Sequence, residues 1–133
     1  MHETFPLPRL DEPLTAGFWS AAQSSRLVMP RLPDGTWHWY PKTTDVEWVE
    51  MSGRGTVFSW TEVHQVFLPA FASEVPYLTG LVTLEEDPSL RLATRFVDCD
   101  SVEIGQPVEV TFRAMRYPTV DAEVLAPYFT PAG

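Results

Sequence analysis

Cysteine is scarce in this sequence. Cys99 is the single cysteine among 133 residues. A disulfide within the chain and a cysteine-held zinc cage are therefore both excluded, because each needs more than one cysteine. The N-terminus has no basic start followed by an apolar run, and no apolar run is long enough to cross a bilayer. We expect a cytoplasmic protein with no membrane partner.

Positive charge is also scarce. Lys and Arg total 9 against 18 Asp and Glu, which gives a formal charge of -9. Such a surface repels nucleic-acid phosphates and anionic membranes. An OB domain that binds single-stranded nucleic acid combines exposed aromatic residues with a basic groove, and few basic residues are available here. We expect no nucleic-acid partner and keep this function as an alternative. Coenzyme A (CoA) is polyanionic too, so it would need a local basic patch or help from a partner.

Catalytic motifs are missing as well. The sequence has no Gly-x-Ser-x-Gly nucleophile motif. Cys99 stands between Asp98 and Asp100, whose carboxylates would raise the thiol pKa and make it a poor nucleophile. Glu62 and His64 would share a strand face, where a carboxylate could orient an imidazole base. A hydrogen-bonded surface histidine is the plainer interpretation. We expect no self-sufficient active site, with a small enzyme using Glu62 and His64 as an alternative.

The first third of the chain predicts a helix and a hairpin. Apolar residues recur every four positions, which predicts a helix over Pro13–Ser25 with Asp11 as its N-cap. Residues 27–29 and 37–40 are the expected arms of a hairpin. Pro33-Asp34-Gly35 between them is strong turn chemistry.

The rest of the chain predicts short antiparallel strands. Alternating apolar and polar residues mark four of them, at 56–66, 78–84, 90–96 and 108–114. The alternation of the first is imperfect, which predicts a β-bulge. Residues 117–133 carry three prolines and predict an extended tail. The expected fold is mainly β, with an N-terminal helix and a hairpin followed by a small OB-type Greek-key barrel. A β-sandwich is the alternative.

Aromatic residues are concentrated before the predicted barrel. A helix and a hairpin cannot bury so much aromatic surface alone, so some of these residues must pack on the barrel and some can contact a partner protein. The residues concerned are Trp19, Trp37, Trp39, Tyr40 and Trp48.

Several motifs together resemble a known family. Phe18-Trp19 opens the helix, Tyr40-Pro41 follows the hairpin, and Glu47 to Thr61 reads EWVEMSGRGTVFSWT. Further on, Ile104 to Val110 reads IGQPVEV. Over roughly residues 14–115 the chain resembles the domain of unknown function 35 family, which pairs an N-terminal helix and a rubredoxin-like zinc ribbon with an OB fold.

The chain departs from that family in the ribbon. The family's two Cys-x-x-Cys knuckles are replaced by residues 31–35 and 42–45, so we expect no zinc. The resemblance implies an arm, a helix and a degenerate, metal-free ribbon in residues 1–50. It implies an OB barrel with a C-terminal tail in residues 51–133, the two forming one compact unit.

The resemblance also implies a function. Family members assemble with thiolase-like enzymes, aldolases or hydratases that act on acyl-CoA thioesters, including those of steroid side-chain degradation. We therefore expect a non-catalytic accessory subunit in a hetero-oligomer with a thiolase or aldolase, as part of a lyase or acyltransferase complex. An enoyl-CoA hydratase complex is the alternative. The only ligand expected is a CoA thioester, and no cofactor is expected. The residues expected to line its channel are Arg54, Trp60, His64 and Tyr77. The residues expected at the partner interface are Phe18, Trp19, Trp37, Trp39 and Tyr40.

Overall fold

A computed structural model describes residue 8 and residues 10–66, 72–115 and 124–132. Within them lie one helix and seven strands. In chain order these are α1 (Ala16–Ala22), β1 (Val28–Arg31), β2 (Glu47–Glu50), β3 (Arg54–Val63), β4 (Tyr77–Leu84), β5 (Arg91–Phe96), β6 (Pro107–Met115) and β7 (Val124–Pro131). In these parts of the chain no helix is long and apolar enough to cross a membrane.

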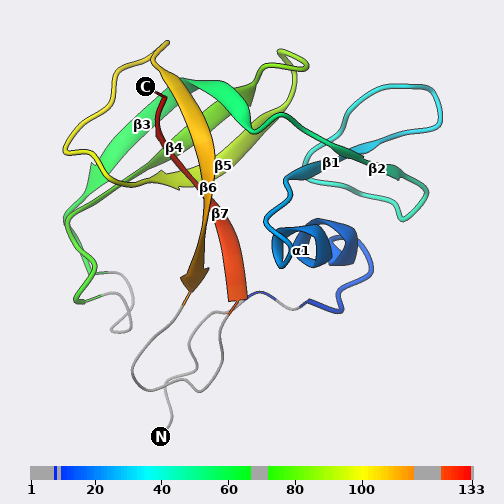
Figure 1. Ribbon diagram of the computed structural model, residues 1–133, viewed down its shortest axis with the longest axis horizontal. Coiled ribbons are helices and arrows are strands. Elements are labelled where there is room, and N and C mark those ends of the chain that lie inside the picture. The colour runs from blue at the N-terminus through cyan, green and yellow to red at the C-terminus, as the bar shows by residue number, and fades with distance from the viewer. Residues whose placement is uncertain (1–7, 9, 67–71, 116–123, 133) are drawn as a thin grey trace, which may run out of the picture.

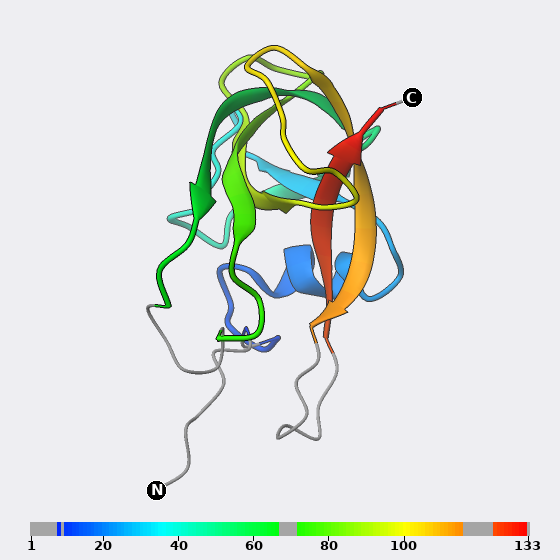
Figure 2. The same ribbon diagram turned by 90° about the vertical axis from the view of Figure 1, so that its left-hand side faces the viewer.

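Five strands form a closed barrel in the order β3-β4-β5-β7-β6 (Figures 1 and 2). This is the strand order of an OB fold, which confirms the predicted mainly β class and shows that the sandwich alternative is wrong. β1 and β2 form a separate two-stranded sheet. That sheet and α1 lie together on one side of the barrel (Figure 1). Inward side chains from all five barrel strands build the core, among them Val57, Val82, Leu92, Val108 and Phe129.

The β-bulge predicted in the first barrel strand is confirmed. Val57 pairs with Val82 and Ser59 with Leu81, so Phe58 is the extra residue. Gly80 lies opposite this bend, and a Cβ there would collide with the backbone of Ser59 and Trp60. The bulge thus needs a glycine on the neighbouring strand for the two backbones to approach each other.

The extended tail predicted over residues 117–133 is wrong for residues 124–131, which form β7, whereas residues 117–123 and 133 lie outside the described part of the chain. This strand runs antiparallel to β6 from Met115↔Val124 to Val108↔Pro131. Prolines do not interrupt it because they occupy one register class, by which we mean alternate positions of β7 whose backbone groups all point to the same side. Phe129 belongs to the same class, and its carbonyl accepts a hydrogen bond from Val97 N–H (2.9 Å), away from β6. Pro127 and Pro131 therefore have their nitrogens on the side facing β5, where no β6 ladder bond is lost.

The seam between β5 and β7 is only partly paired. The register holds one parallel pair, Phe96↔Phe129. Thr94 Oγ1 lies 3.4 Å from the Pro127 carbonyl oxygen, so a side chain helps to bridge the two strands. β7 thus closes the barrel with few backbone hydrogen bonds on this side, and the buried Phe129 side chain contributes much of the closure.

Helix α1 is shorter than predicted, and its N-cap residue is Thr15 rather than Asp11. Residues 12–15 form a turn before it, in which Thr15 N–H donates to the Glu12 carbonyl (3.0 Å). At the other end Ser25 has a positive φ of 57° and Arg26 N–H bonds back to the Ala21 carbonyl (3.0 Å). A left-handed residue with such a bond ends helices, so the helix cannot reach Ser25.

Gln23, just after α1, attaches the helix to the barrel seam. Its Nε2 donates to the Leu125 carbonyl (3.0 Å), and its Oε1 accepts from Leu125 N–H (3.0 Å). Leu125 shares the register class of Phe129, so both of its backbone groups point away from β6. The side-chain amide therefore pairs with β7 as a neighbouring strand would.

Replacing Gln23 by methionine is expected to lower the free energy of unfolding by about 1–2 kcal/mol. The change removes both bonds to Leu125 and the bond from Nε2 to the Trp19 carbonyl (2.9 Å), and it keeps the length of the side chain. Gln23→Glu keeps the acceptor but sets a carboxylate oxygen against the Leu125 carbonyl oxygen, so its effect should be at least as large. Urea unfolding of the three proteins measures both differences. A methionine variant as stable as the parent would show that water replaces the amide at no cost.

The predicted hairpin arms at 27–29 and 37–40 are wrong, although the turn between them occurs. β1 pairs with β2, from Val28↔Glu50 to Arg31↔Glu47, and only an isolated bridge joins Arg31 to Trp37. The aromatic segment leaves the sheet because Trp39 packs on α1, with its ring centroid 4.7 Å from that of Phe18.

Candidate partner interface and ligand site

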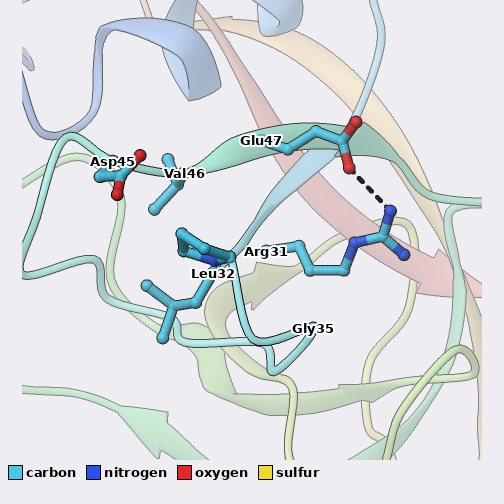
Figure 3. Close-up of a pocket in the computed structure, with 7 residues that line it drawn as sticks. Arg31, Leu32, Gly35, Asp45, Val46 and Glu47 are labelled. Atoms are coloured by element: carbon cyan, nitrogen blue, oxygen red, sulfur yellow. Dashed lines mark hydrogen bonds and ion pairs between the residues drawn. The ribbon is translucent and has the colours of Figure 1, made fainter.

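The tip of the two-stranded sheet encloses a hollow of about 440 Å³ (Figure 3). It lies between the two segments that replace the family's cysteine knuckles. Its lining residues are Arg31, Leu32, Pro33, Gly35, Asp45, Val46 and Glu47. One ion pair spans it, with Arg31 Nη2 2.7 Å from Glu47 Oε1. The Arg31 guanidinium also lies 5.6 Å from the Trp37 ring centroid.

These residues do not fit a zinc ion. The lining offers two carboxylates, Asp45 and Glu47, and Glu47 is already bonded to a cation. A structural zinc site needs four nitrogen, sulfur or oxygen ligands. In the described parts of the chain no group of three or more His, Cys, Asp or Glu could hold a metal.

The turn at the tip is held by its own side chains. Asp34 Oδ1 accepts hydrogen bonds from Thr36 N–H (3.0 Å) and from Thr36 Oγ1–H (2.6 Å). These bonds lower the pKa of the Asp34 carboxyl below its ordinary value. Gly35 has a φ of +87°, which suits glycine.

Chelation is therefore expected to leave the fold unchanged. A chain purified without added metal should show the same melting temperature with and without EDTA, to within about 1 °C, because no ligand set depends on zinc. Elemental analysis of the purified protein should find less than stoichiometric zinc. A lower melting temperature in EDTA would show that a metal contributes to the fold.

A groove lined by aromatic and small residues runs between α1 and the barrel; we call it the aromatic groove. Its volume is about 330 Å³. The lining residues are Phe18, Trp19, Trp39, Tyr40, Leu92, Ala93, Met115, Ala126, Pro127 and Tyr128. The Trp39 ring stands 5.4 Å from the Tyr40 ring, and Tyr40 is 54% exposed. The groove crosses the β5–β7 seam, so its base is made of small side chains and proline.

The structure brings four of the five predicted interface residues into this groove. Phe18 is buried (4% exposed) and supports the groove from the core, whereas Trp19 and Trp39 are half-buried. Trp37 lies elsewhere, against Arg31 at the sheet tip.

A polar cleft of about 350 Å³ adjoins the aromatic groove, and Tyr128 lines both. Arg95 lies with its guanidinium 4.4 Å from the Tyr77 ring centroid and its Nη1 3.5 Å from Glu74 Oε1. Arg113 donates a hydrogen bond to Asp98. Two guanidinium groups thus lie beside the apolar groove, each with a carboxylate neighbour.

The ionisable groups of this cleft are not tuned for nucleophilic chemistry. Burial, then the charges of Asp100 and Asp98, raise the pKa of the Cys99 thiol above its ordinary value. Burial also raises the pKa of Tyr128, while the hydrogen bond from Arg113 lowers that of Asp98. A protonated thiol and a protonated phenol are poor nucleophiles at neutral pH, so the cleft favours binding over catalysis.

The four predicted ligand residues do not form one site. Arg54 begins β3 and His64 follows its end, on the order of 30 Å apart at about 3.3 Å per residue. Arg54 lines a separate hollow with residues such as Thr83 and Pro107, whereas Tyr77 lines the polar cleft. Trp60 is 42% exposed on β3.

Glu62 and His64 meet as predicted from their spacing. Glu62 Oε1 lies 2.6 Å from His64 Nε2, and the two side chains are 42% and 69% exposed. Such an exposed pair is typical of a hydrogen-bonded surface histidine and gives no support to the small-enzyme alternative.

Sequence reasoning missed half of the aromatic groove and both arginines of the cleft. Ala126, Pro127 and Tyr128 were missed because β7 was expected to be a tail. Arg95 and Arg113 occupy outward positions of cleanly alternating strands, so that pattern could have identified them as exposed cations.

Comparisons with known proteins agree with the OB fold. The family model described as "ChsH2, C-terminal OB-fold domain" matches residues 48–113. The solved structure "Ltp2-ChsH2(DUF35) aldolase" superposes with a TM-score of 0.77 at 32% identity, covering 95% of this chain and 100% of the other.

Two kinds of curated relative were found. The chain is 35% identical over 105 residues to the "3-oxo-4,17-pregnadiene-20-carboxyl-CoA hydratase alpha subunit" of Mycobacterium tuberculosis, covering 74% of this chain and 33% of that protein. It is 34% identical over 77 residues to a "DUF35 domain-containing scaffold protein" of Methanocaldococcus jannaschii, covering 56% of this chain and 52% of that protein. The chain therefore spans about a third to a half of the length of these curated relatives.

Proposed function

Because the chain belongs to the DUF35 family and has the OB barrel of its ChsH2-type members, we propose that it is a non-catalytic accessory subunit that docks on a thiolase-like acyl-CoA enzyme. In this proposal the chain helps to shape the acyl-CoA site, and the partner supplies the catalytic residues. Residues 1–50 and 51–133 act as two parts of one compact unit.

The aromatic groove is the observation that carries this proposal. Tryptophan and tyrosine are common anchors of protein interfaces, and partly exposed rings beside small residues suit the insertion of a partner's side chains. Trp19, Trp39 and Tyr40 have this arrangement. Phe18 positions them from the core, and the proposed role of Trp37 is a contact outside the groove.

We propose a CoA thioester as the ligand of the assembled complex. CoA is polyanionic, and the polar cleft places two guanidinium donors next to an apolar groove on an otherwise acidic chain. Each arginine is paired with a carboxylate, so a CoA phosphate would have to compete with Glu74 or Asp98 for it. Tyr77 stacks on one of the two arginines. Arg54, Trp60 and His64 lie outside the cleft, so any contact they make with the ligand requires surfaces supplied by the partner.

Two reactions remain for the partner. The name of the similar solved structure favours an aldolase, hence a carbon–carbon lyase. The pregnadiene carboxyl-CoA in the name of one curated relative favours a steroid side-chain thioester as the substrate. The names of two curated relatives, each 35% identical, favour hydration of an enoyl-CoA instead. We place the aldolase first because that structural match covers the whole of the other chain.

Co-expression tests the proposal. The chain is expressed with each thiolase-fold and each hydratase protein of its source organism, and complexes are isolated through a tag on the partner. A complex that cleaves or hydrates an acyl-CoA, together with an isolated chain that does neither, is the expected result. Turnover by the isolated chain would contradict the proposal, and so would a chain that binds none of these enzymes.

A further inference from the structure

One edge of β3 has no neighbouring strand along half of its length. β3 pairs with β4 from Gly55 to Val63, but with β6 only from Arg54 to Thr56. Next to β6, the loop before that strand bonds to Val57, with Val57 N–H donating to the Gln106 carbonyl (3.0 Å) and Gly105 N–H to the Val57 carbonyl (2.8 Å). Across the described chain, no residue pairs with this edge from Phe58 to Val63.

The register shows which backbone groups this leaves unpaired. The backbone N–H and C=O groups of Val57 both point away from β4. Along a strand of an antiparallel pair, residues whose backbone groups point away from the neighbouring strand alternate with residues that hydrogen-bond to it. The bulge at Phe58 shifts this alternation by one residue. The N–H and C=O groups of Trp60 and Glu62 therefore face outward, whereas those of Thr61 and Val63 face β4.

The surroundings of this edge are apolar. Phe58 is 44% exposed, Trp60 42% and Ile104 72%. Arg91 covers one side of Phe58, with its guanidinium 4.0 Å from the ring centroid. Free edges are usually protected by lysine, proline or a covering element, and residues 59–63 contain neither lysine nor proline. An edge with open hydrogen bonds and exposed aromatic rings is suited to receive another strand.

We propose that an extended segment of the partner enzyme adds a strand to this edge of β3. The inference rests on the proposed function for the identity of that partner. Apolar side chains of the segment would pack on Phe58 and Trp60, and a basic side chain would join His64 beside the Glu62 carboxylate, since charge complementarity favours a cation there. A second copy of this chain is disfavoured, because each copy carries a charge of -9 and two Glu62 carboxylates would share one short ribbon.

This edge is a contact separate from the aromatic groove. Figures 1 and 2 place β3 on the side of the barrel away from α1. A segment that fills the groove leaves the edge open, so the two contacts can be tested independently.

Glu62→Pro is the test, with Glu62→Ala as its matched control. Both remove the carboxylate, but only proline removes the outward N–H, at a position where no bond to β4 is lost. For the tagged acyl-CoA enzyme that captures the wild-type chain, we expect Glu62→Ala to change Kd by less than about threefold and Glu62→Pro to raise it by about tenfold or more. Equal Kd values for the proline and alanine variants would overturn the strand addition while leaving the proposed function intact.

Hydrogen exchange of the wild-type chain supplies a readout that does not depend on the folding of the proline variant. The Trp60 and Glu62 amides should exchange quickly in the free chain and at least about tenfold more slowly in the complex, since a new hydrogen bond must open before exchange. Unchanged exchange at both amides in a stable complex would overturn the inference alone. A wild-type chain that captures no acyl-CoA enzyme would overturn the proposed function and this inference together. Dimerisation through β3 would overturn the choice of occupant.

Discussion

Replacing Phe129 by alanine is expected to lower the free energy of unfolding by about 3–5 kcal/mol. Phe129 is fully buried at 0% exposure and makes the single register pair that joins β7 to β5. Truncating it leaves a cavity in the core at the point where backbone pairing is weakest. Small domains have about 5–15 kcal/mol of stability in total, so this loss is a large fraction of the free energy of unfolding.

Phe129→Leu is the matched control. It keeps most of the apolar volume and should cost less than about 1.5 kcal/mol. Urea unfolding followed by tryptophan fluorescence measures both variants. If both variants lowered the free energy of unfolding by an equally small amount, β7 would not be part of the cooperative core, and the barrel would be closed in another way.

Replacing Tyr40 by alanine is expected to weaken partner binding by about 2 kcal/mol, or roughly 30-fold in Kd. The Tyr40 side chain is more than half exposed in the free chain and lines the aromatic groove. Its only ring contact among the described residues is with Trp39 (5.4 Å), so the loss of folding stability should stay below about 1 kcal/mol. A large effect on binding with a small effect on folding distinguishes an interface residue from a core residue.

Trp37→Ala provides the comparison within the same segment. Trp37 is aromatic and precedes Tyr40 by three residues, but it lies against Arg31 and does not line the groove. Calorimetric titration with the purified partner should show a smaller loss of affinity for this variant than for Tyr40→Ala, because the proposed contact of Trp37 lies outside the groove. Equal losses from Tyr40→Ala and Trp37→Ala would show that the interface covers the two-stranded sheet rather than the groove.

The parts of the fold that the sequence predicts well depend on local patterns. The alternation around Phe96 and Val108 identified strands to within a few residues, and the broken alternation near Phe58 identified the bulge. The turn at Pro33-Asp34-Gly35 follows from backbone preferences alone. In each case neighbouring residues carry the signal, and packing agrees with it.

The errors arise where contacts between residues far apart in the sequence determine the structure. Proline lacks a backbone N–H, so Pro127 and Pro131 argue against a strand. They are compatible with β7 only because their nitrogens face away from β6, and the sequence does not show this. The partner of β1 was misassigned because Trp39 is drawn to Phe18 on α1, a contact that no local pattern shows. The aromatic groove was predicted only in part for the same reason. Its aromatic residues are recognisable in the sequence, whereas Ala93 and Ala126 can be assigned to the groove only once the fold places them beside those rings.

The bond between Gln23 and Leu125 has a consequence for biosynthesis. It joins residues that lie 102 positions apart, so Gln23 is synthesised long before Leu125. Helix α1 therefore cannot reach its final position on the barrel while the ribosome is still adding β7. The aromatic groove is completed only once β7 is present, because Ala126, Pro127 and Tyr128 line it, so a nascent chain that still lacks β7 offers its partner an incomplete docking surface.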